Sequence, residues 1–226
     1  MEQAAKQHIK KKTKVVSVKL LLLLSLFCLT LFVFWMIVGE IVHEHENNFD
    51  SSVFSWLANI TNPGVTKIML AFTFFGSSEF LLPFYIILTA FYLIKKNSKL
   101  SVNVAVTAIS GTALLFFFKH IFQRKRPLDP LVHNLVGFSF PSGHSFSAFT
   151  FFGLLIYILW QQPLNIIWKW SLSAFCFLMA SLIAISRVYL HAHYASDVLA
   201  GFCLSTMWLI ISFWLLDIID KKFNLK

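Results

Sequence analysis

The run LLLLLSLFCLTLFVFWMIV, Leu20 to Val38, holds no charged residue and follows six lysines within the first nineteen positions. An apolar helix needs about 20 residues to cross the hydrocarbon core of a bilayer, so this run is long enough to span one. The apolar region of a secretory signal peptide is shorter, about 7–15 residues, and ends at a small-residue cleavage site. Gly39-Glu40-Ile41 follows here instead, so the sequence predicts a retained membrane anchor.

Composition extends this interpretation to the whole chain. Hydrophobic residues make up 58% and charged residues 13% of the 226 positions, against about 45–50% and about 25% in soluble domains. This number of charged residues is too small to cover the surface of a soluble protein. The excess apolar side chains are therefore expected to face lipid. The same figures exclude intrinsic disorder, collagen and a disulfide-stapled secreted module. The formal charge of +9 comes from lysine clusters flanking apolar runs, which is typical of membrane topology and predicts no nucleic-acid partner.

Five more apolar runs predict an all-α integral membrane protein with a bundle of six transmembrane helices. We expect a basic arm at 1–19, a six-span domain at 20–216 and a tail at 217–226. The second span is expected to break near Gly76-Ser77-Ser78-Glu79 and again at Pro83, with Glu79 in a water-exposed break near the outer boundary rather than orienting a cation or substrate. The five runs are within 68–94, 102–118, 144–160, 168–185 and 197–216.

The Lys and Arg count predicts the orientation. With cytoplasmic N- and C-termini, 13 of the 19 cations fall on the inner side, as the positive-inside rule requires of a multi-pass cell-membrane protein. Topology alone would place few cations outside, yet five of the other six lie in two polar segments that also hold histidines. The six outer cations are Lys67, Lys119, Arg124, Lys125, Arg126 and Arg187.

These outer cations predict a site for an anion. Ionisable groups at span ends are costly unless they pair, reach water or bind a ligand, and Lys119, Arg126 and Arg187 outnumber Asp197, the obvious local anion. Arg forks match phosphate oxygens bidentately and Lys adds a point charge, so phosphate is favoured over carboxylate. An interfacial belt of cations on lipid headgroups is the alternative. It explains the charges but not the histidines.

A helix start adds to the anion site. Pro141 and Ser142 precede an apolar helix that is expected to begin near His144, an N-cap and first-turn pattern. The free backbone N–H groups and the positive dipole end of such a helix favour phosphate.

His193 and Asp197 are four residues apart, which on a helix places them on one face about 40° from each other. A carboxylate that holds one imidazole nitrogen leaves the other free to attack, so His193 is the expected nucleophile. His191 is the rival, but it would lie about 120° from Asp197 around such a helix, and we expect it at the rim. The alternative role for His193 is to tie helix ends together.

His144 would then protonate the leaving oxygen and later deprotonate water, while the three cations hold the phosphate oxygens. This scheme uses no metal and no cofactor. A zinc site is the alternative, but its ligands have no dedicated spacing and the surrounding cations would repel a metal. Its ligands would be His144, His191, His193 and Asp197.

Three polar segments, at residues 119–127, 140–145 and 186–197, hold these candidate residues. Together they resemble the signature of the type 2 phosphatidic acid phosphatase family, which vanadium haloperoxidases share. The family pattern is Lys, six residues, Arg-Pro; then Pro-Ser-Gly-His; then Ser-Arg, five residues, His, three residues, Asp. This chain has all three in order, without departure, and the resemblance covers about residues 66–216. The matching residues are Lys119, Arg126-Pro127, Pro141-Ser142-Gly143-His144, Ser186-Arg187, His193 and Asp197.

The resemblance implies a six-helix core, a phosphohistidine mechanism without metal and an active site at the outer membrane face. It implies that His144 is the acid, His193 the nucleophile and Asp197 its orienting partner. Haloperoxidase relatives are soluble and hold vanadate, and six lipid-facing spans argue against that activity. The phosphate-binding residues would be Lys119, Arg126, Ser142, Gly143 and Arg187.

A membrane lipid carrying a terminal phosphate is therefore the expected substrate. The chain most resembles small bacterial family members that act on phosphatidylglycerophosphate or undecaprenyl diphosphate, and phosphatidate is a third candidate. The motifs do not choose among the three, and no sequence feature sets the oligomeric state. The rival from another class is an anion-binding membrane transporter, although transporter sites tend to lie near the midplane in interrupted helices.

Overall fold

The structure is a computed structural model that describes residues 2–43, 48–133 and 135–223. These residues form helices and loops, and six of the helical segments are long and apolar enough to cross a membrane. The predicted all-α, multi-pass fold is therefore confirmed. The helices in chain order are α1 Glu2–His43, α2 Asn48–Ala58, α3 Pro63–Phe74, α4 Ser78–Ile94, α5 Ser98–Phe122, α6 Gly143–Gln161, α7 Ile166–Tyr189 and α8 Ala195–Phe223.

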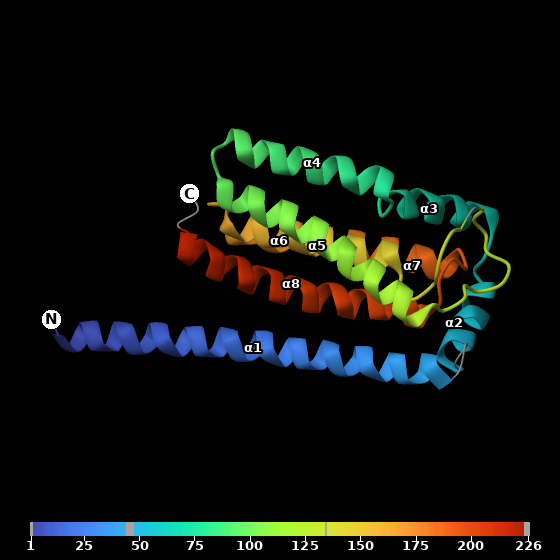
Figure 1. The fold of residues 1–226 in the computed structure, drawn as a ribbon, viewed down its shortest axis with the longest axis horizontal. Coiled ribbons are helices and arrows are strands. Elements are labelled where there is room, and N and C mark those ends of the chain that lie inside the picture. Colours follow the sequence, from blue (N-terminus) through green and yellow to red (C-terminus); the bar gives the residue numbers. More distant parts are fainter. Residues whose placement is uncertain (1, 44–47, 134, 224–226) are drawn as a thin grey trace.

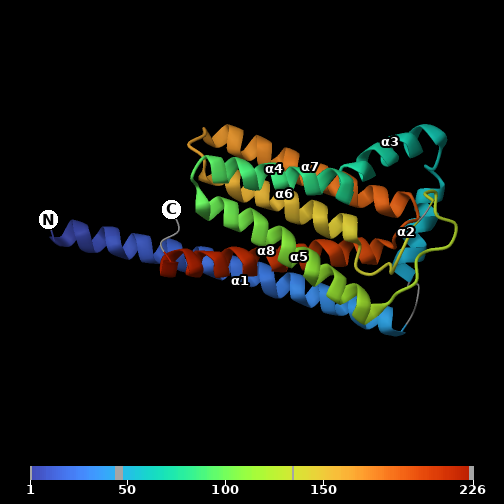
Figure 2. The same cartoon turned by 45° about the horizontal axis from the view of Figure 1, so that its top comes forward.

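The spanning helices run side by side along the long axis of the molecule (Figure 1). The start of α1, the end of α8 and the α4–α5 and α6–α7 connections lie at one end of the bundle, which we call the terminal end. Short helix α2, the loop 123–142 and the turn 190–194 lie at the other, which we call the site end. In the rotated view α1 lies along α8, and its N-terminal part extends beyond the other helices (Figure 2).

Helix α8 lies at the centre of the packing, in contact with α1, α2, α5, α6 and α7. Membrane helices associate through close van der Waals contact, which small residues allow. Gly201 on α8 shows this, because a Cβ there would lie 3.0 Å from the Ser142 carbonyl oxygen and from Ser145 Oγ. Phe34 of α1 packs against Phe140, two residues before Ser142, with ring centroids 5.8 Å apart. The segment that leads into α6 thus contacts both α8 and α1.

The second span consists of two helices, α3 and α4, separated at residues 75–77. The predicted break near Gly76 is confirmed, and a Cβ at Gly76 would lie 2.4 Å from Ile183 Cγ2 and 3.2 Å from His144 Cδ2. Glu79 is exposed in the first turn of α4, where a carboxylate is favourable to the helix dipole. The predicted break at Pro83 is wrong, since α4 continues through it; membrane helices tolerate proline when local adjustments satisfy the freed carbonyl.

Helix α2 was not predicted. Its residues lie between the first two predicted spans, where no helix was expected. The helix is short and its sequence has no long apolar run, so no sequence pattern predicts it. It brings Asp50, a fully buried residue, under the site end.

Candidate active site

Backbone contacts tie the start of α6 to the start of α8. The Ser142 N–H donates to the Asp197 carbonyl oxygen at 3.0 Å, and Ser145 Oγ donates to the Val198 carbonyl oxygen at 2.8 Å. Ser142 is the N-cap of α6, as predicted, and its Oγ accepts from the Ser145 N–H at 3.5 Å. Two of the three polar segments therefore meet at one place, with the α6 N-terminus at their junction.

His193 lies in the turn between α7 and α8 rather than on a helix. Helix α8 begins only at Ala195, so the prediction that His193 and Asp197 share a helix face is wrong. The chain first uses the Ala192 and His193 N–H groups to bind the Arg187 carbonyl oxygen at the end of α7, at 3.0 and 3.2 Å. The pair forms nonetheless, with His193 Nδ1 3.6 Å from Asp197 Oδ2.

The turn is made by His191, whose φ of 51° is in the left-handed region. A left-handed residue just after a helix end is a common way to reverse the chain. The His191 ring packs on Phe54 of α2, with centroids 4.6 Å apart, and partial burial lowers its pKa although Asp129 opposes the shift. His191 thus has a turn-forming role beside the site.

The two ring nitrogens of His193 face different partners. Nε2 lies 3.2 Å from Arg126 Nη1, while Nδ1 lies 3.3 Å from Ser139 Oγ. Ser139 Oγ in turn donates to Asp197 Oδ2 at 2.5 Å. Burial lowers the pKa of His193 to about 4, against the opposing effect of Asp197. The imidazole is therefore neutral near pH 7, and this arrangement favours a proton on Nδ1 and a lone pair on Nε2.

Three cations approach the same place from three elements. Lys119, in the last turn of α5, donates to the Phe138 carbonyl oxygen at 2.6 Å. Arg126 donates to the carbonyl oxygens of Ala192, Val136 and Gly137 at 2.8, 2.9 and 3.1 Å. Burial lowers the pKa of Arg126, and Asp197 opposes this; an arginine nevertheless stays charged at neutral pH.

Arg187, near the end of α7, is the most deeply buried of the three at 4% exposed. Its Nη1 donates to Thr73 Oγ1 of α3 at 2.5 Å. Its Nε is buried without a hydrogen-bond partner in the described part of the chain. An unsatisfied buried donor on a cation is costly and calls for an acceptor, as a phosphate oxygen would be.

His144 completes the cluster from the first turn of α6. It interacts electrostatically with Arg187, His193, Arg126 and Lys119. Gly143 beside it lies next to the Lys119 side chain, since a Cβ there would be 3.8 Å from Lys119 Cε, an ordinary van der Waals distance. The structure therefore brings all eight sequence-predicted site residues to the site end. Among the described residues, no group of three or more His, Cys, Asp or Glu side chains could hold a metal ion.

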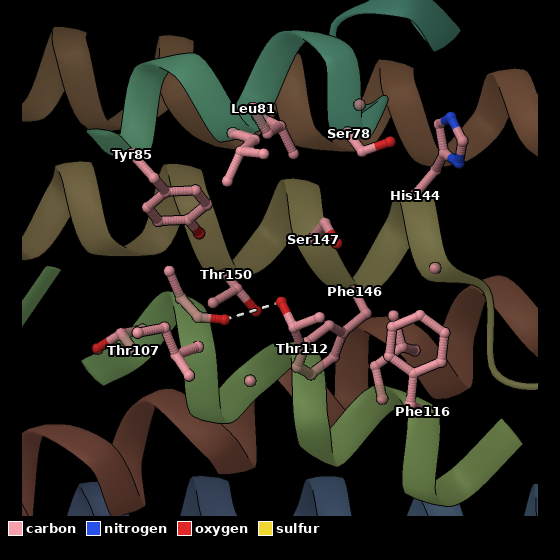
Figure 3. Close-up of a pocket in the computed structure, with 17 residues that line it drawn as sticks. Ser78, Leu81, Tyr85, Thr107, Thr112, Phe116, His144, Phe146, Ser147 and Thr150 are labelled. Atoms are coloured by element: carbon pink, nitrogen blue, oxygen red, sulfur yellow. Dashed lines mark hydrogen bonds between the residues drawn. The ribbon is translucent and has the colours of Figure 1, made fainter. Parts of the chain in front are cut away.

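A cavity of about 540 Å³ opens next to His144, between α4, α5 and α6 (Figure 3). Its lining is mostly apolar, and several lining side chains, such as Leu82, Ile109 and Phe116, are more than half exposed on the outside of the bundle. It reaches Thr150 on α6, which is about 9 Å along the helix from His144 at 1.5 Å per residue. The cavity thus connects the polar cluster with the lipid-facing side of the protein.

Comparison with known proteins agrees with this geometry. Residues 99–219 match the PAP2 superfamily. Phosphatidylglycerophosphatase B of Bacillus subtilis (strain 168) is 31% identical over 199 residues, which cover 85% of this chain and 94% of that protein. This chain belongs to the PAP2 superfamily. Another relative, YbjG of Escherichia coli (strain K12), bears a name that refers to undecaprenyl-diphosphatase. It is 27% identical over 161 residues, 68% of this chain and 76% of its own length.

Two solved structures share the fold of this chain. The crystal structure of the transmembrane PAP2-type phosphatidylglycerolphosphate phosphatase from Bacillus subtilis has a TM-score of 0.70 and 30% identity, covering 89% of this chain and 96% of that one. Aquifex aeolicus LpxE has a TM-score of 0.58 and 24% identity, covering 75% and 98%, and shows the fold alone. The chain is therefore a membrane-embedded PAP2-type lipid phosphatase.

Sequence reasoning missed Thr73, Arg124 and Ser139, which contact PAP2 signature residues. It also missed Asp50, which contacts Arg124 and Ser196 behind them. Arg124 had one signal, since it was among the outer cations that topology left unexplained. Ser139 lies two residues before Pro141, but a serine at that position is not specific enough to predict a contact with His193 or Asp197. Asp50 and Thr73 are more than 60 positions from the residues they contact, so only the fold brings them in.

Proposed function

We propose that this chain removes the terminal phosphate of a membrane lipid through a phosphohistidine formed on His193. The cavity beside His144 is the observation that carries the proposal. It places an apolar space against Gly143 and His144, at the edge of the site that holds the three cations, which is the arrangement that a lipid phosphate needs. A soluble phosphate ester would have no use for a lipid-exposed opening.

In the first step, the His193 Nε2 lone pair attacks phosphorus. The bond from phosphorus to the lipid oxygen breaks, and His144 gives that oxygen a proton. Asp197 and Ser139 hold the Nδ1 side of the imidazole, so the positive charge that develops on the ring has a nearby carboxylate. Lys119, Arg126 and Arg187, with the α6 N-terminus at Ser142 and Gly143, bind the phosphate oxygens as charge redistributes.

In the second step, a water molecule gives its proton to His144 and bonds to phosphorus. The bond between phosphorus and His193 Nε2 breaks, and inorganic phosphate leaves. The same imidazole thus acts first as acid and then as base. The contacts of Arg126 with both His193 Nε2 and the Ala192 carbonyl oxygen support a role in holding the attacking ring against the phosphate.

The substrate we propose is phosphatidylglycerophosphate or undecaprenyl diphosphate, with phosphatidate as the alternative. The names of the Bacillus subtilis and Escherichia coli relatives support the first two. We further propose that residues 20–216 form the catalytic membrane domain, that the arm 1–19 and tail 217–226 are cytoplasmic, and that the site end faces the extracytoplasmic side. The excess of Lys and Arg on the other side supports this orientation.

The test is phosphate release by the purified protein from the three lipids, side by side, in the presence of a chelator. His193→Ala is expected to abolish release, and His144→Ala to reduce kcat by about 10²–10⁴, the usual contribution of general acid–base catalysis. Lys125→Ala, which removes an exposed neighbouring cation, is the matched control and should keep full activity. Full activity in the His193 variant would overturn the mechanism, and phosphate binding without hydrolysis of any lipid would favour a transporter.

The cavity has its own test. Ala108→Phe fills the cavity from α5, so it should reduce kcat/KM for long-chain lipids by at least about tenfold while sparing a short-chain phosphate ester. Val106→Phe adds the same bulk on an exposed face of the same helix and serves as the control. Equal losses on long and short substrates would show that the cavity does not hold the lipid chain.

A further inference from the structure

A buried ion network lies behind the proposed nucleophile, on the far side of Asp197. Arg124 Nη1 donates to Asp197 Oδ1 at 2.7 Å, and its Nη2 donates to Asp50 Oδ2 at 2.9 Å. The side chains are 1% exposed for Arg124 and 0% for each aspartate. The guanidinium also stacks 3.9 Å from the centre of the Tyr194 ring. One cation is thus shared between two carboxylates with almost no access to water.

Asp50 does more than pair with Arg124. Its Oδ1 accepts from the Ser196 N–H at 2.9 Å, and its Oδ2 accepts from Ser196 Oγ at 2.6 Å. Ser196 is the second residue of α8, whose first N–H groups have no partner inside the helix. The residue before α8 is Tyr194, which has no acceptor side chain suited to capping. Asp50 therefore caps α8 from another helix, and it fixes the first turn, which carries Asp197.

The two carboxylate oxygens of Asp197 have different hydrogen-bond partners. Oδ1 is held by Arg124. Oδ2 accepts from Ser139 Oγ and from the Tyr194 N–H at 2.9 Å, and it is the oxygen that faces His193. Because Arg124 holds the oxygen turned away from the imidazole, it sets the plane of the carboxylate. It also offsets part of the negative charge that His193 experiences.

We propose that Asp50 and Arg124 are positioning residues that act through Asp197 to set the proton affinity of the His193 nucleophile. The inference rests on the proposed function, because it assumes that His193 attacks as a neutral imidazole. Arg124 weakens the pull of Asp197 on a proton at His193, and Asp50 weakens the effect of Arg124. Removing the Arg124 charge should therefore raise the pKa of His193, and removing the Asp50 charge should lower it.

Other charged groups also face His193 and stay in place in every variant. Their effects are common to all the proteins compared, as is the titration of the substrate phosphate, so differences between variants report the network. These groups are Asp197 on α8, Arg187 on α7, Arg126 in the loop 123–142 and His144 on α6.

The experiment is the pH profile of kcat/KM for one lipid phosphate, measured with the full-length protein in detergent. The acid limb reports protonation of the free enzyme's base. Arg124→Gln removes a positive charge, so protonation of His193 becomes easier and the acid limb should move to higher pH by about half a unit or more. Asp50→Asn removes a negative charge and should move the limb to lower pH by a smaller amount.

Matched controls separate this effect from general damage. Lys125→Gln and Asp129→Asn make the same charge changes at exposed positions of the loop and should leave the limb in place. Arg124→Lys keeps the positive charge but loses the guanidinium group that binds both aspartates at once. We therefore expect kcat to fall and the acid limb to stay at the same pH. If Arg124→Gln does not fold, the Asp50→Asn and Arg124→Lys profiles decide the question alone.

Limbs that coincide for all folded variants, or that shift in the same direction for Arg124→Gln and Asp50→Asn, would overturn the inference. The wild-type protein and His193→Ala are assayed alongside. Suppose that the wild type is active, His193→Ala is inactive, and the acid limbs of the Arg124 and Asp50 variants match that of the wild type. The proposed function would then stand, and only the role of the network would be rejected. Activity in His193→Ala would reject the proposed function itself.

Discussion

Both ends of the bundle carry ion pairs, and the two differ in their access to water. At the terminal end, Lys99 of α5 and Asp220 of α8 are 2.5 Å apart, with side chains 29% and 19% exposed. At the site end, Arg124 lies between Asp50 and Asp197 with 1% or less of each side chain exposed. Water can replace either member of the first pair. It cannot do so in the second, so every charge there depends on the others.

The largest effect is expected from removing one partner of the buried network. Asp50→Ala leaves Arg124 with one carboxylate and removes the cap of α8. Breaking a buried pair in this way costs about 3–5 kcal/mol, so the midpoint of thermal unfolding in detergent should fall by several degrees. Asp129→Asn, at an exposed position of the loop where asparagine tolerates the positive φ, is the control. An unfolding midpoint equal to wild type in Asp50→Ala would show that the network contributes no stability.

The next effect is a pH dependence that arises at the site end. The pKa of His193 is about 4 in the folded protein and about 6.5 in an unfolded chain. The unfolded state therefore binds more protons below pH 6.5, and stability is lost as the pH falls from about 6.5 to 4. Unfolding midpoints measured across this range should decline less in His193→Asn than in wild type. Parallel curves would mean that the buried imidazole is not the group responsible.

A smaller effect is expected at the turn that presents His193. His191 has a positive φ, which a β-branched residue adopts at a cost of about 1–2 kcal/mol and asparagine tolerates. His191→Val should therefore lower both stability and kcat, and His191→Asn should lower neither. The comparison of unfolding midpoint and kcat between these two variants checks this. Loss of activity in His191→Asn would instead indicate a chemical role for the imidazole.

The smallest effect is expected at the terminal end. Lys99→Ala removes a partly exposed pair, and such pairs contribute about 0–1 kcal/mol. The unfolding midpoint should change by no more than about two degrees, and kcat should not change. Measured beside Asp50→Ala, it sets the scale for the contrast between the two ends. A loss as large as that of Asp50→Ala would remove the distinction.

The sequence predicts the six spans because each is a long apolar run, and it predicts the signature residues because their types and spacing are specific. It does not predict that His193 leaves the helix of Asp197, since the turn depends on how the Ala192 and His193 N–H groups bind the end of α7. Helix α2 is short and has no distinctive periodicity. The proline at position 83 shows that a breaker residue is overridden when a helix is held by its neighbours.

The contact between Phe34 and Phe140 bears on what counts as the catalytic unit. The superfamily match begins at residue 99, yet Phe34 supports the segment that leads into Pro141, and Asp50 supports the segment that carries Asp197. Both residues precede the matched region. A fragment trimmed to the matched region would keep every signature residue and lose the scaffold that aligns them. The catalytic unit of this chain therefore includes helices α1 and α2, which lie ahead of every signature residue.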